Sequence, residues 1–357
     1  MHALVYTGTE KIEYREEKDP IAKPGETLIK VQASGICGSD MHAYHGKDER
    51  RIPPLILGHE FSGTSLDGKF KNKQVVVNPL ISCENCAYCQ NKREHLCPER
   101  TMIGMSTPMK RDGGLAELVS VPEKNIYETP NDLSIKEAAL AEPTAVALHA
   151  VLLAEQNLKK PLSECKILIQ GAGAIGLLCG LVLNKTKKAT NIIMSDPNKK
   201  RLDECGKYLK ASFVSPNDKS IKENNYDLIL ESVGLEVTRH QAIKSIAPGG
   251  TIIHIGLTEP SGTFNFKKLT IQEVTLVGTY CYTSRDFEQT IAILREKMVY
   301  IPIISPKKTK FSGIIIFSLA EIKDAATARS AAVSVIFKPP ATFKYTSSPE
   351  NLSLIHI

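Results

Sequence analysis

Residues 166–176 read KILIQGAGAIG, and this stretch decides the fold of the second half of the chain. A short apolar run leads into the pattern G-x-G-x-x-G, and an apolar, helix-like stretch follows it. Gly171 permits a tight turn after a strand, Gly173 lets the backbone approach a pyrophosphate, and Gly176 lets the helix pack closely. This order of strand, turn and helix is typical of a unit that binds a dinucleotide. The alternative is a glycine-rich turn with a purely structural role.

Residues beyond the glycine motif indicate which dinucleotide fits. Asp196 lies about 20 residues after the last glycine, at the end of a second predicted strand, 192–195. A carboxylate there accepts hydrogen bonds from the ribose hydroxyls and repels a 2′-phosphate, which favours NAD over NADP. Ala174 and Ile175 open the helix, whose free N–H groups would face the phosphates. Arg201 either contacts the ribose or adenine or is a solvated surface residue, and the sequence leaves that choice open.

Predicted strands and helices alternate around this motif. Such alternation implies a parallel sheet with helical crossovers, so we expect a doubly wound α/β Rossmann domain over residues 141–279. A helix over Ile135–Leu153, broken at Pro143, is expected at its start. The predicted strands are Lys166–Gln170, Ile192–Ser195, Asp227–Glu231, Thr251–Ile255 and Val274–Gly278.

The flanking parts of the chain have a different character. Residues 1–140 contain short apolar runs separated by Gly, Pro and Asp, which favours a β-rich domain. Residues 280–338 are expected to return to that domain, with a helix at Asp286–Lys297 and a strand at Val333–Phe337, although the sequence alone does not show the return. The Ser/Pro-rich tail, 339–357, is expected to be poorly ordered, and whether it is native stays open.

Composition excludes several classes of protein. The chain has 357 residues, and its formal charge of +6 comes from scattered Lys and Arg rather than from a basic arm with aromatic residues. This distribution argues against nucleic-acid binding. No apolar run reaches the roughly 18 residues of a membrane span, and the first residues read as a strand rather than as a signal peptide. A cytoplasmic enzyme with a small-molecule substrate and no membrane partner is therefore expected.

Four cysteines crowd into one short segment, 83–97. In a reducing compartment such crowding favours a metal over disulfides, and zinc accepts four thiolates in a closed tetrahedral shell. An iron–sulfur cluster is the competing interpretation, but the seven-residue gap before the last cysteine is longer than in a ferredoxin run. The segment therefore predicts a structural zinc that stabilises a loop with little core of its own. The four predicted ligands are Cys83, Cys86, Cys89 and Cys97.

Two further segments carry metal-ligating side chains. One reads Gly35-Ile36-Cys37-Gly38-Ser39-Asp40-Met41-His42, and the other reads Gly58-His59-Glu60. Each is weak alone, because a single Cys is usually buried packing and a single His is usually a satisfied polar residue.

Together, these segments and the two motifs resemble the medium-chain zinc-dependent alcohol dehydrogenase family over nearly the whole chain. The segments Gly113–Glu117 and Glu142–His149 are most similar to its polyol branch, which includes sorbitol and galactitol-phosphate dehydrogenases. The resemblance implies a GroES-like catalytic domain beside the Rossmann domain. It also implies two zinc ions per chain, NAD as cofactor, and a homodimer or homotetramer.

The resemblance also implies the roles of individual residues. Cys37 and His59 would bind a catalytic zinc, with Glu60 as a ligand or an alternating near-ligand. Glu142 would place a second carboxylate beside the metal, and Asp40 would orient the metal-binding histidine. An open zinc site of this kind keeps a position for substrate and lowers the pKa of an alcohol.

The same resemblance implies a proton relay. Ser39 would pass the proton of the alcohol to His42, whose imidazole titrates near physiological pH. The competing interpretations are a loop hydroxyl for Ser39, an exposed loop histidine for His42, and a buried ion pair or helix-start carboxylate for Glu60 and Glu142.

The substrate is less well determined. A free polyol, a polyol phosphate and a sugar-acid alcohol all fit the resemblance. Five cations either face the cleft to receive a phosphate or form ordinary surface charge, and the second interpretation is preferred. A zinc-free quinone- or enone-type reductase on the same fold, and a non-catalytic NAD-binding protein, stay as alternatives. The five cations are Lys47, Arg50, Arg51, Lys110 and Arg111.

Overall fold

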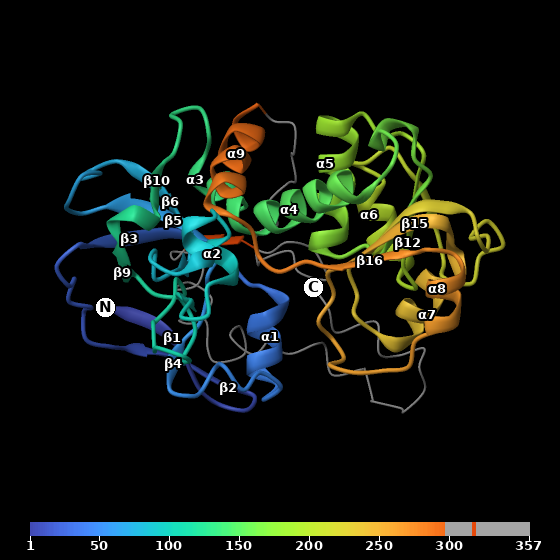
Figure 1. Ribbon diagram of the computed structural model, residues 1–357. Coiled ribbons are helices and arrows are strands. Elements are labelled where there is room, and N and C mark those ends of the chain that lie inside the picture. The colour runs from blue at the N-terminus through green and yellow to red at the C-terminus, as the bar shows by residue number, and fades with distance from the viewer. Residues whose placement is uncertain (297–315, 319–357) are drawn as a thin grey trace.

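The computed structural model describes residues 1–296 and 316–318. The described chain forms a β-rich half that contains the N-terminus and an α/β half built on a parallel sheet (Figure 1). Helices α4 (Ala141–Asn157) and α9 (Ser284–Arg295) pack against each other and lie between the two halves in Figure 1.

The α/β half contains one six-stranded parallel sheet in the order β13-β12-β11-β14-β15-β16. The chain starts in the middle of the sheet and winds outward to both edges, so the order reverses beside β11. In such sheets, ligands bind outside the carboxyl ends of the strands at this switch point. The strands are β11 (Ile167–Gln170), β12 (Ile192–Ser195), β13 (Ser212–Val214), β14 (Tyr226–Glu231), β15 (Ile246–His254) and β16 (Thr275–Gly278).

Helices cover both faces of this sheet, with α5 above it and α7 and α8 below it in Figure 1. The alternation along β11 explains the layering, since successive side chains of a strand point to opposite faces. Ile167 and Ile169 pack in the core that contains α4 and α5, and Leu168 packs in the core that contains α7. The helices are α5 (Ala174–Lys187), α6 (Lys199–Cys205), α7 (Glu236–Ser245) and α8 (Phe266–Ile271).

The β-rich half contains a sheet in the order β10-β6-β5-β3-β17, in which β9 also pairs with β3. Residues 316–318 form β17 and pair with β3 in the register Ile316↔Gly35, so the chain returns here after the parallel sheet. The strands are β3 (Glu26–Gly35), β5 (Phe61–Ser65), β6 (Gln74–Val77), β9 (Leu118–Pro122), β10 (Ile126–Glu128) and β17 (Ile316–Ser318).

Smaller elements complete this half. A second sheet has the order β2-β1-β4, and a two-stranded sheet pairs β7 with β8 beside the cysteine segment. These elements are β1 (His2–Gly8), β2 (Lys11–Glu16), β4 (Leu55–Ile56), β7 (Leu80–Ile81), β8 (Thr101–Met102), α1 (Gly38–Tyr44), α2 (Ala87–Gln90) and α3 (Ile135–Ala138).

The prediction of a helix break at Pro143 is wrong. The interruption falls at residues 139–140, between α3 and α4, and Pro143 lies in the first turn of α4. Proline is tolerated there because the first N–H groups of a helix have no partner one turn earlier. The predicted strand Val333–Phe337 and the tail 339–357 lie outside the described residues. The domain boundaries 1–140, 141–279 and 280–338 stay predictions.

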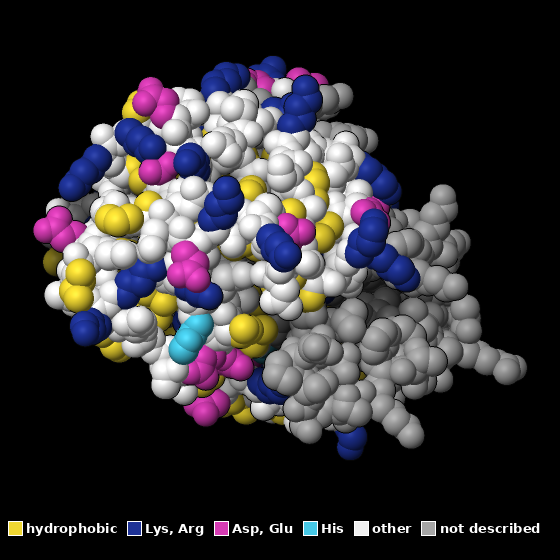
Figure 2. Space-filling model, turned by 90° about the vertical axis from the view of Figure 1, so that its right-hand side faces the viewer, with side chains coloured by type: hydrophobic (Ala, Val, Ile, Leu, Met, Phe, Trp, Pro, Cys, Tyr) yellow, Lys and Arg dark blue, Asp and Glu magenta, His cyan; other side chains and the backbone are white. Residues whose placement is uncertain are grey.

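Surface charge is mixed rather than segregated. Figure 2 shows Lys and Arg side chains interspersed with Asp, Glu and apolar groups over the described part of one face. Among residues 1–296 and 316–318, no helix combines the length and the apolar character needed to cross a bilayer.

Candidate active site

Cys37, His59 and Glu60 come together in the β-rich half. Cys37 precedes α1, whereas His59 and Glu60 directly precede β5. One ligand atom from each of the three side chains lies within 4.8 Å of the others, and His59 and Glu60 are buried. Sulfur, nitrogen and oxygen donors that converge at such distances form a site for a divalent metal ion.

The imidazole of His59 is held on both sides. Its Nδ1 lies 3.5 Å from Oδ1 of Asp40, and its Nε2 lies 3.5 Å from Oγ of Ser39. Burial opposes the charged imidazolium, but the neighbouring Asp40 and Cys37 outweigh burial and raise the pKa of His59 well above its ordinary value. Asp40 is fully buried and also accepts a hydrogen bond from the backbone N–H of Cys37 at 3.0 Å. The aspartate therefore connects two members of the group.

Two buried carboxyl groups lie at this centre. Burial raises the pKa of Glu60 well above its ordinary value, and the negative charges of Cys37 and Glu142 raise it further. Burial also raises the pKa of Glu142, which lies in the first turn of α4. A bound cation would stabilise both carboxylates in place of the missing water. Glu142 is near enough to influence the group by its charge, but it is not one of the three side chains that converge within 4.8 Å.

Arg51 is the main surprise of the site. Its side chain is fully buried, and it donates to Oγ of Ser39 at 3.0 Å and to the backbone oxygen of Gly104 at 3.2 Å. It also pairs with Asp48 and lies 3.8 Å from Oδ1 of Asp40. The preference for surface charge is therefore wrong for Arg51, because its buried guanidinium lies beside the carboxylates of Asp40 and Asp48 and donates to the Ser39 hydroxyl.

The other predicted cations have different surroundings. Arg50 pairs with Asp48 and lines a cavity of about 560 Å³ between the two halves, which is also lined by Arg239, His254 and Tyr280. Arg111 pairs with Glu26 of β3.

The proposed proton acceptor His42 is half-buried on α1. Burial and the positive charge of Lys47 lower the pKa of His42 below its ordinary value. Oγ of Ser39 contacts His59 and Arg51, and a direct step from Ser39 to His42 stays a prediction.

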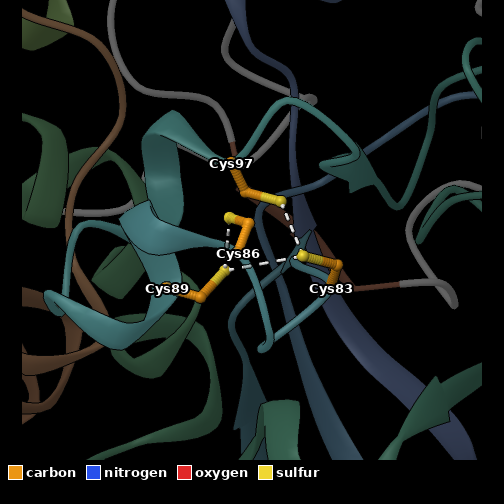
Figure 3. A group of neighbouring side chains, drawn as sticks. All are labelled: Cys83, Cys86, Cys89 and Cys97. Carbon is orange, nitrogen blue, oxygen red and sulfur yellow. Dashed lines mark hydrogen bonds between the residues drawn. The ribbon is translucent and has the colours of Figure 1, made fainter.

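The four cysteines form a compact group (Figure 3). The Sγ atoms of Cys86 and Cys89 are 3.5 Å apart, as are those of Cys97 and Cys83, and those of Cys83 and Cys89 are 3.9 Å apart. Four sulfurs placed tetrahedrally at about 2.3 Å from zinc would be about 3.8 Å from one another. The spacing of the cysteines therefore fits a zinc ion.

The glycine motif forms the turn at the switch point of the parallel sheet. Gly171 has φ +95°, and a Cβ on Gly176 would lie 1.9 Å from the backbone oxygen of Gly171. Nothing lies within 4 Å of a Cβ on Gly173, so that side of the turn is open. Ala174 and Ile175 form the first turn of α5.

Asp196 is buried at the end of β12. Its Oδ2 accepts from the backbone N–H of Ala172 at 2.9 Å, and its Oδ1 accepts from Asn198 at 2.7 Å. Arg201 is also buried, with Nη1 3.7 Å from Oδ2 of Asp196. A buried ion pair beside the glycine turn excludes the reading of Arg201 as a solvated surface residue.

The sequence patterns did not identify Tyr282 as a residue of the site. It is fully buried and packs beside Glu142, although it comes from the segment between β16 and α9. A tyrosine in an ordinary-looking YCYTS stretch carries no pattern that would single it out. Its place in the site becomes visible only when the segment before α9 is brought beside α4 in the folded chain.

Comparison with known proteins decides the family. Residues 23–131 match the alcohol dehydrogenase GroES-like domain, and residues 174–296 match the zinc-binding dehydrogenase domain. The chain is 30% identical over 341 residues to the probable D-xylulose reductase A of Neosartorya fischeri, a match that covers 89% of this chain and 91% of that protein. The chain belongs to the zinc-dependent alcohol dehydrogenase family.

Solved structures agree with this assignment. Galactitol-1-phosphate dehydrogenase from Escherichia coli shares the fold with a TM-score of 0.78 at 24% identity, over 89% of this chain and 100% of that chain. The 2R,3R-butanediol dehydrogenase of Bacillus subtilis has a TM-score of 0.70 at 27% identity, over 83% of this chain and 88% of that chain. The predicted family and fold class are therefore confirmed. This zinc-dependent dehydrogenase is an oxidoreductase of the polyol branch.

Proposed function

We propose that this dehydrogenase transfers a hydride between a secondary hydroxyl of a polyol and NAD, with one zinc ion at the reacting centre and a second in the cysteine segment. The observation that carries the proposal is the convergence of Cys37, His59 and Glu60. Their mixed donor set fits an open zinc site, and the buried carboxyl groups around it call for a cation. Zinc at this place would polarise the substrate hydroxyl and lower its pKa.

The chain's own residues prepare the chemistry. Asp40 lies against Nδ1 of His59, which directs Nε2 of the imidazole toward the metal position. Arg51 donates to Oγ of Ser39, so the serine oxygen accepts from the guanidinium and its own proton is left to be donated elsewhere. The proposed path for the substrate proton runs through this hydroxyl to the imidazole of His42.

NAD would lie across the carboxyl edge of the parallel sheet. The turn at Gly171 and the first residues of α5 would hold the pyrophosphate, and Asp196 would lie beside the adenosine ribose. The cavity of about 560 Å³ at the end of β15 would then hold part of the dinucleotide, since neither Cys37 nor His59 lines it. Similar structures carry NADH or NADP, which supports a nicotinamide dinucleotide as the cofactor.

The substrate class follows the relatives. The named D-xylulose reductases support a polyol or its ketose as substrate. The galactitol-1-phosphate dehydrogenase shares only the fold at its level of identity, so the choice between a free and a phosphorylated polyol needs direct measurement.

The test is a panel of polyols and polyol phosphates read by NADH absorbance, with zinc measured on the same sample. We expect two zinc ions per chain and NADH formation from at least one polyol. Cys37→Ala should reduce zinc to one ion per chain and abolish turnover, while NAD still binds. Turnover that survives in Cys37→Ala would support the zinc-free reductase. NAD binding without turnover of any alcohol would support the non-catalytic alternative. A homodimer or homotetramer and a cytoplasmic location stay predictions.

A further inference from the structure

The segment 280–284 leads from β16 into the first residue of α9, and its Cys281 packs on the apolar cluster of β7 and β8 beside the cysteine segment. We propose that the cysteine segment positions Tyr282 at the catalytic centre by holding both ends of 280–284. This proposal rests on the proposed function and assigns positioning roles to Tyr282 and to Glu94. We call residues 83–100 the cysteine lobe.

The first end of the segment is held by an arginine of the lobe. The guanidinium of Arg100 lies 4.8 Å from the ring centre of Tyr280, in a cation–π contact. The same side chain donates from Nη1 to the backbone oxygen of Cys97 at 2.9 Å. Arg100 therefore joins the backbone of a predicted zinc ligand to the start of the segment.

The second end is held by a carboxylate of the lobe. Oε1 of Glu94 accepts a hydrogen bond from the backbone N–H of Ser284, the first residue of α9. That N–H has no partner within the helix, so the contact satisfies a part-buried donor at the start of α9. Between the two ends, Cys281 packs against Leu80 and Met102 of β7 and β8, which flank the lobe.

A second contact fixes the lobe on α4 and α9. The rings of His95 and His149 meet edge to face, with centroids 4.9 Å apart. Nδ1 of His149 lies 2.8 Å from Oδ2 of Asp286. Lobe, α4 and α9 thus form one packed unit, and α4 carries Glu142 in its first turn.

Tyr282 is the residue that this unit presents to the centre. Its ring is fully buried, and within residues 1–296 and 316–318 its hydroxyl has no hydrogen-bond partner that meets ordinary geometry. Burial raises the pKa of Tyr282 well above its ordinary value, and the negative charges of Glu142, Cys281 and Glu60 raise it further. Because a buried hydroxyl is rarely left without a partner, we assign the Glu142 carboxylate as its acceptor in the working enzyme. Tyr282 would thereby fix the orientation of Glu142 beside the metal position.

Two variants remove the hydrogen bond between Glu94 and Ser284 without changing a residue of the catalytic centre. Glu94→Ala removes the acceptor. Ser284→Pro removes the backbone donor together with the serine hydroxyl that contacts Glu94 and Tyr127. Proline is tolerated at the first position of a helix, and the preceding Thr283 is already extended, with ψ 160°. Glu94→Gln keeps an acceptor oxygen. Glu99→Ala removes an exposed carboxylate of the same lobe and serves as the matched control.

The kinetic test measures kcat per zinc-replete chain in these variants and in the Tyr282→Phe background. We expect Glu94→Ala and Ser284→Pro each to lower kcat about tenfold, and Glu94→Gln to stay within about twofold of the wild type. Tyr282→Phe should lower kcat similarly, and adding Glu94→Ala to it should cause no further fall. A further tenfold fall in the double variant, or an unchanged kcat in Glu94→Ala, would overturn the proposal.

Hydrogen exchange gives a readout that needs no turnover. The amides of 280–286 should exchange faster in Glu94→Ala and Ser284→Pro than in the wild type, and at the wild-type rate in Glu99→Ala. Equal exchange in all four proteins would contradict the proposal that the cysteine lobe holds the segment 280–284. If the wild type turns over no alcohol, the proposed function fails, while this measurement still decides whether the lobe holds the segment.

Discussion

A Cβ atom on Gly35 would lie 2.1 Å from Oε2 of Glu60, so this carboxylate occupies the space that any side chain at position 35 would fill. The backbone N–H of Gly35 also donates to the backbone oxygen of Glu60 at 2.6 Å. The end of β3 therefore sets the place of a proposed metal ligand.

This contact makes Gly35→Ala a test of the ligand set. The added methyl group must displace the Glu60 carboxylate, and we expect the affinity for the catalytic zinc to fall by about 10–100-fold. Competition with a zinc chelator measures the change. Gly8→Ala is the control, since nothing lies within 4 Å of a Cβ there. Equal zinc affinity in Gly35→Ala and the wild type would show that Glu60 is not a ligand.

The buried Arg51 should dominate the stability of this region. Arg51→Leu leaves the fully buried Asp40 without its arginine and Asp48 with only the partly exposed Arg50, so we expect the free energy of unfolding to fall by about 3–5 kcal/mol. Urea unfolding of the zinc-loaded protein measures it. Arg50→Leu is the comparison, because the Arg50 side chain is 44% exposed and its pair with Asp48 should contribute about 1 kcal/mol or less. Similar losses in both variants would contradict the buried network.

The pH profile should report His42. In the proposed relay, alcohol oxidation requires neutral His42 as proton acceptor, and burial together with Lys47 lowers the pKa of His42. The activity should therefore persist below pH 6.5 and fall only as the pH drops through this lowered pKa. His42→Gln should lose at least about tenfold in kcat/KM at pH 7 and lose this acid limb. His45→Gln removes one of the weaker positive charges that lower the pKa of His42, so it should keep the acid limb, moved only slightly to higher pH, and keep kcat/KM at pH 7.

Cofactor choice should depend on Asp196. Replacing it with Ser removes the negative charge that would repel a 2′-phosphate and removes its ion pair with Arg201. We expect the ratio of kcat/KM for NADP to that for NAD to rise by about 10–100-fold. Initial rates with both cofactors measure the ratio. An unchanged ratio would mean that Asp196 acts only through its hydrogen bonds to Ala172 and Asn198.

Much of the parallel sheet could be predicted because its signals are local. The strand Ile192–Ser195 was predicted with the observed bounds, and β11 and β16 differ from their predictions by one residue. Central strands of parallel sheets are continuous apolar runs that need no distant partner to be recognised. The antiparallel half depends on pairings across long separations, so β17 was not predicted at all.

The site shows the same division. Cys37, His59 and Glu60 converge as predicted, because the resemblance supplied their spacing. The burial of Arg51 and the position of Tyr282 were not predictable. Both depend on side chains that meet from segments far apart, and an arginine surrounded by polar residues reads as surface charge until its acidic partners are placed around it.

The pairing of β17 with β3 has a consequence for synthesis on the ribosome. Residues 33–35 emerge first, but the strand that covers their edge follows only after the entire parallel sheet has been made. Until then the nascent N-terminal half exposes an open strand edge, which is a template for association with other chains. The α/β half can complete its own sheet earlier. We therefore expect it to finish folding first, and the N-terminal catalytic half to finish last, although that half is synthesised first.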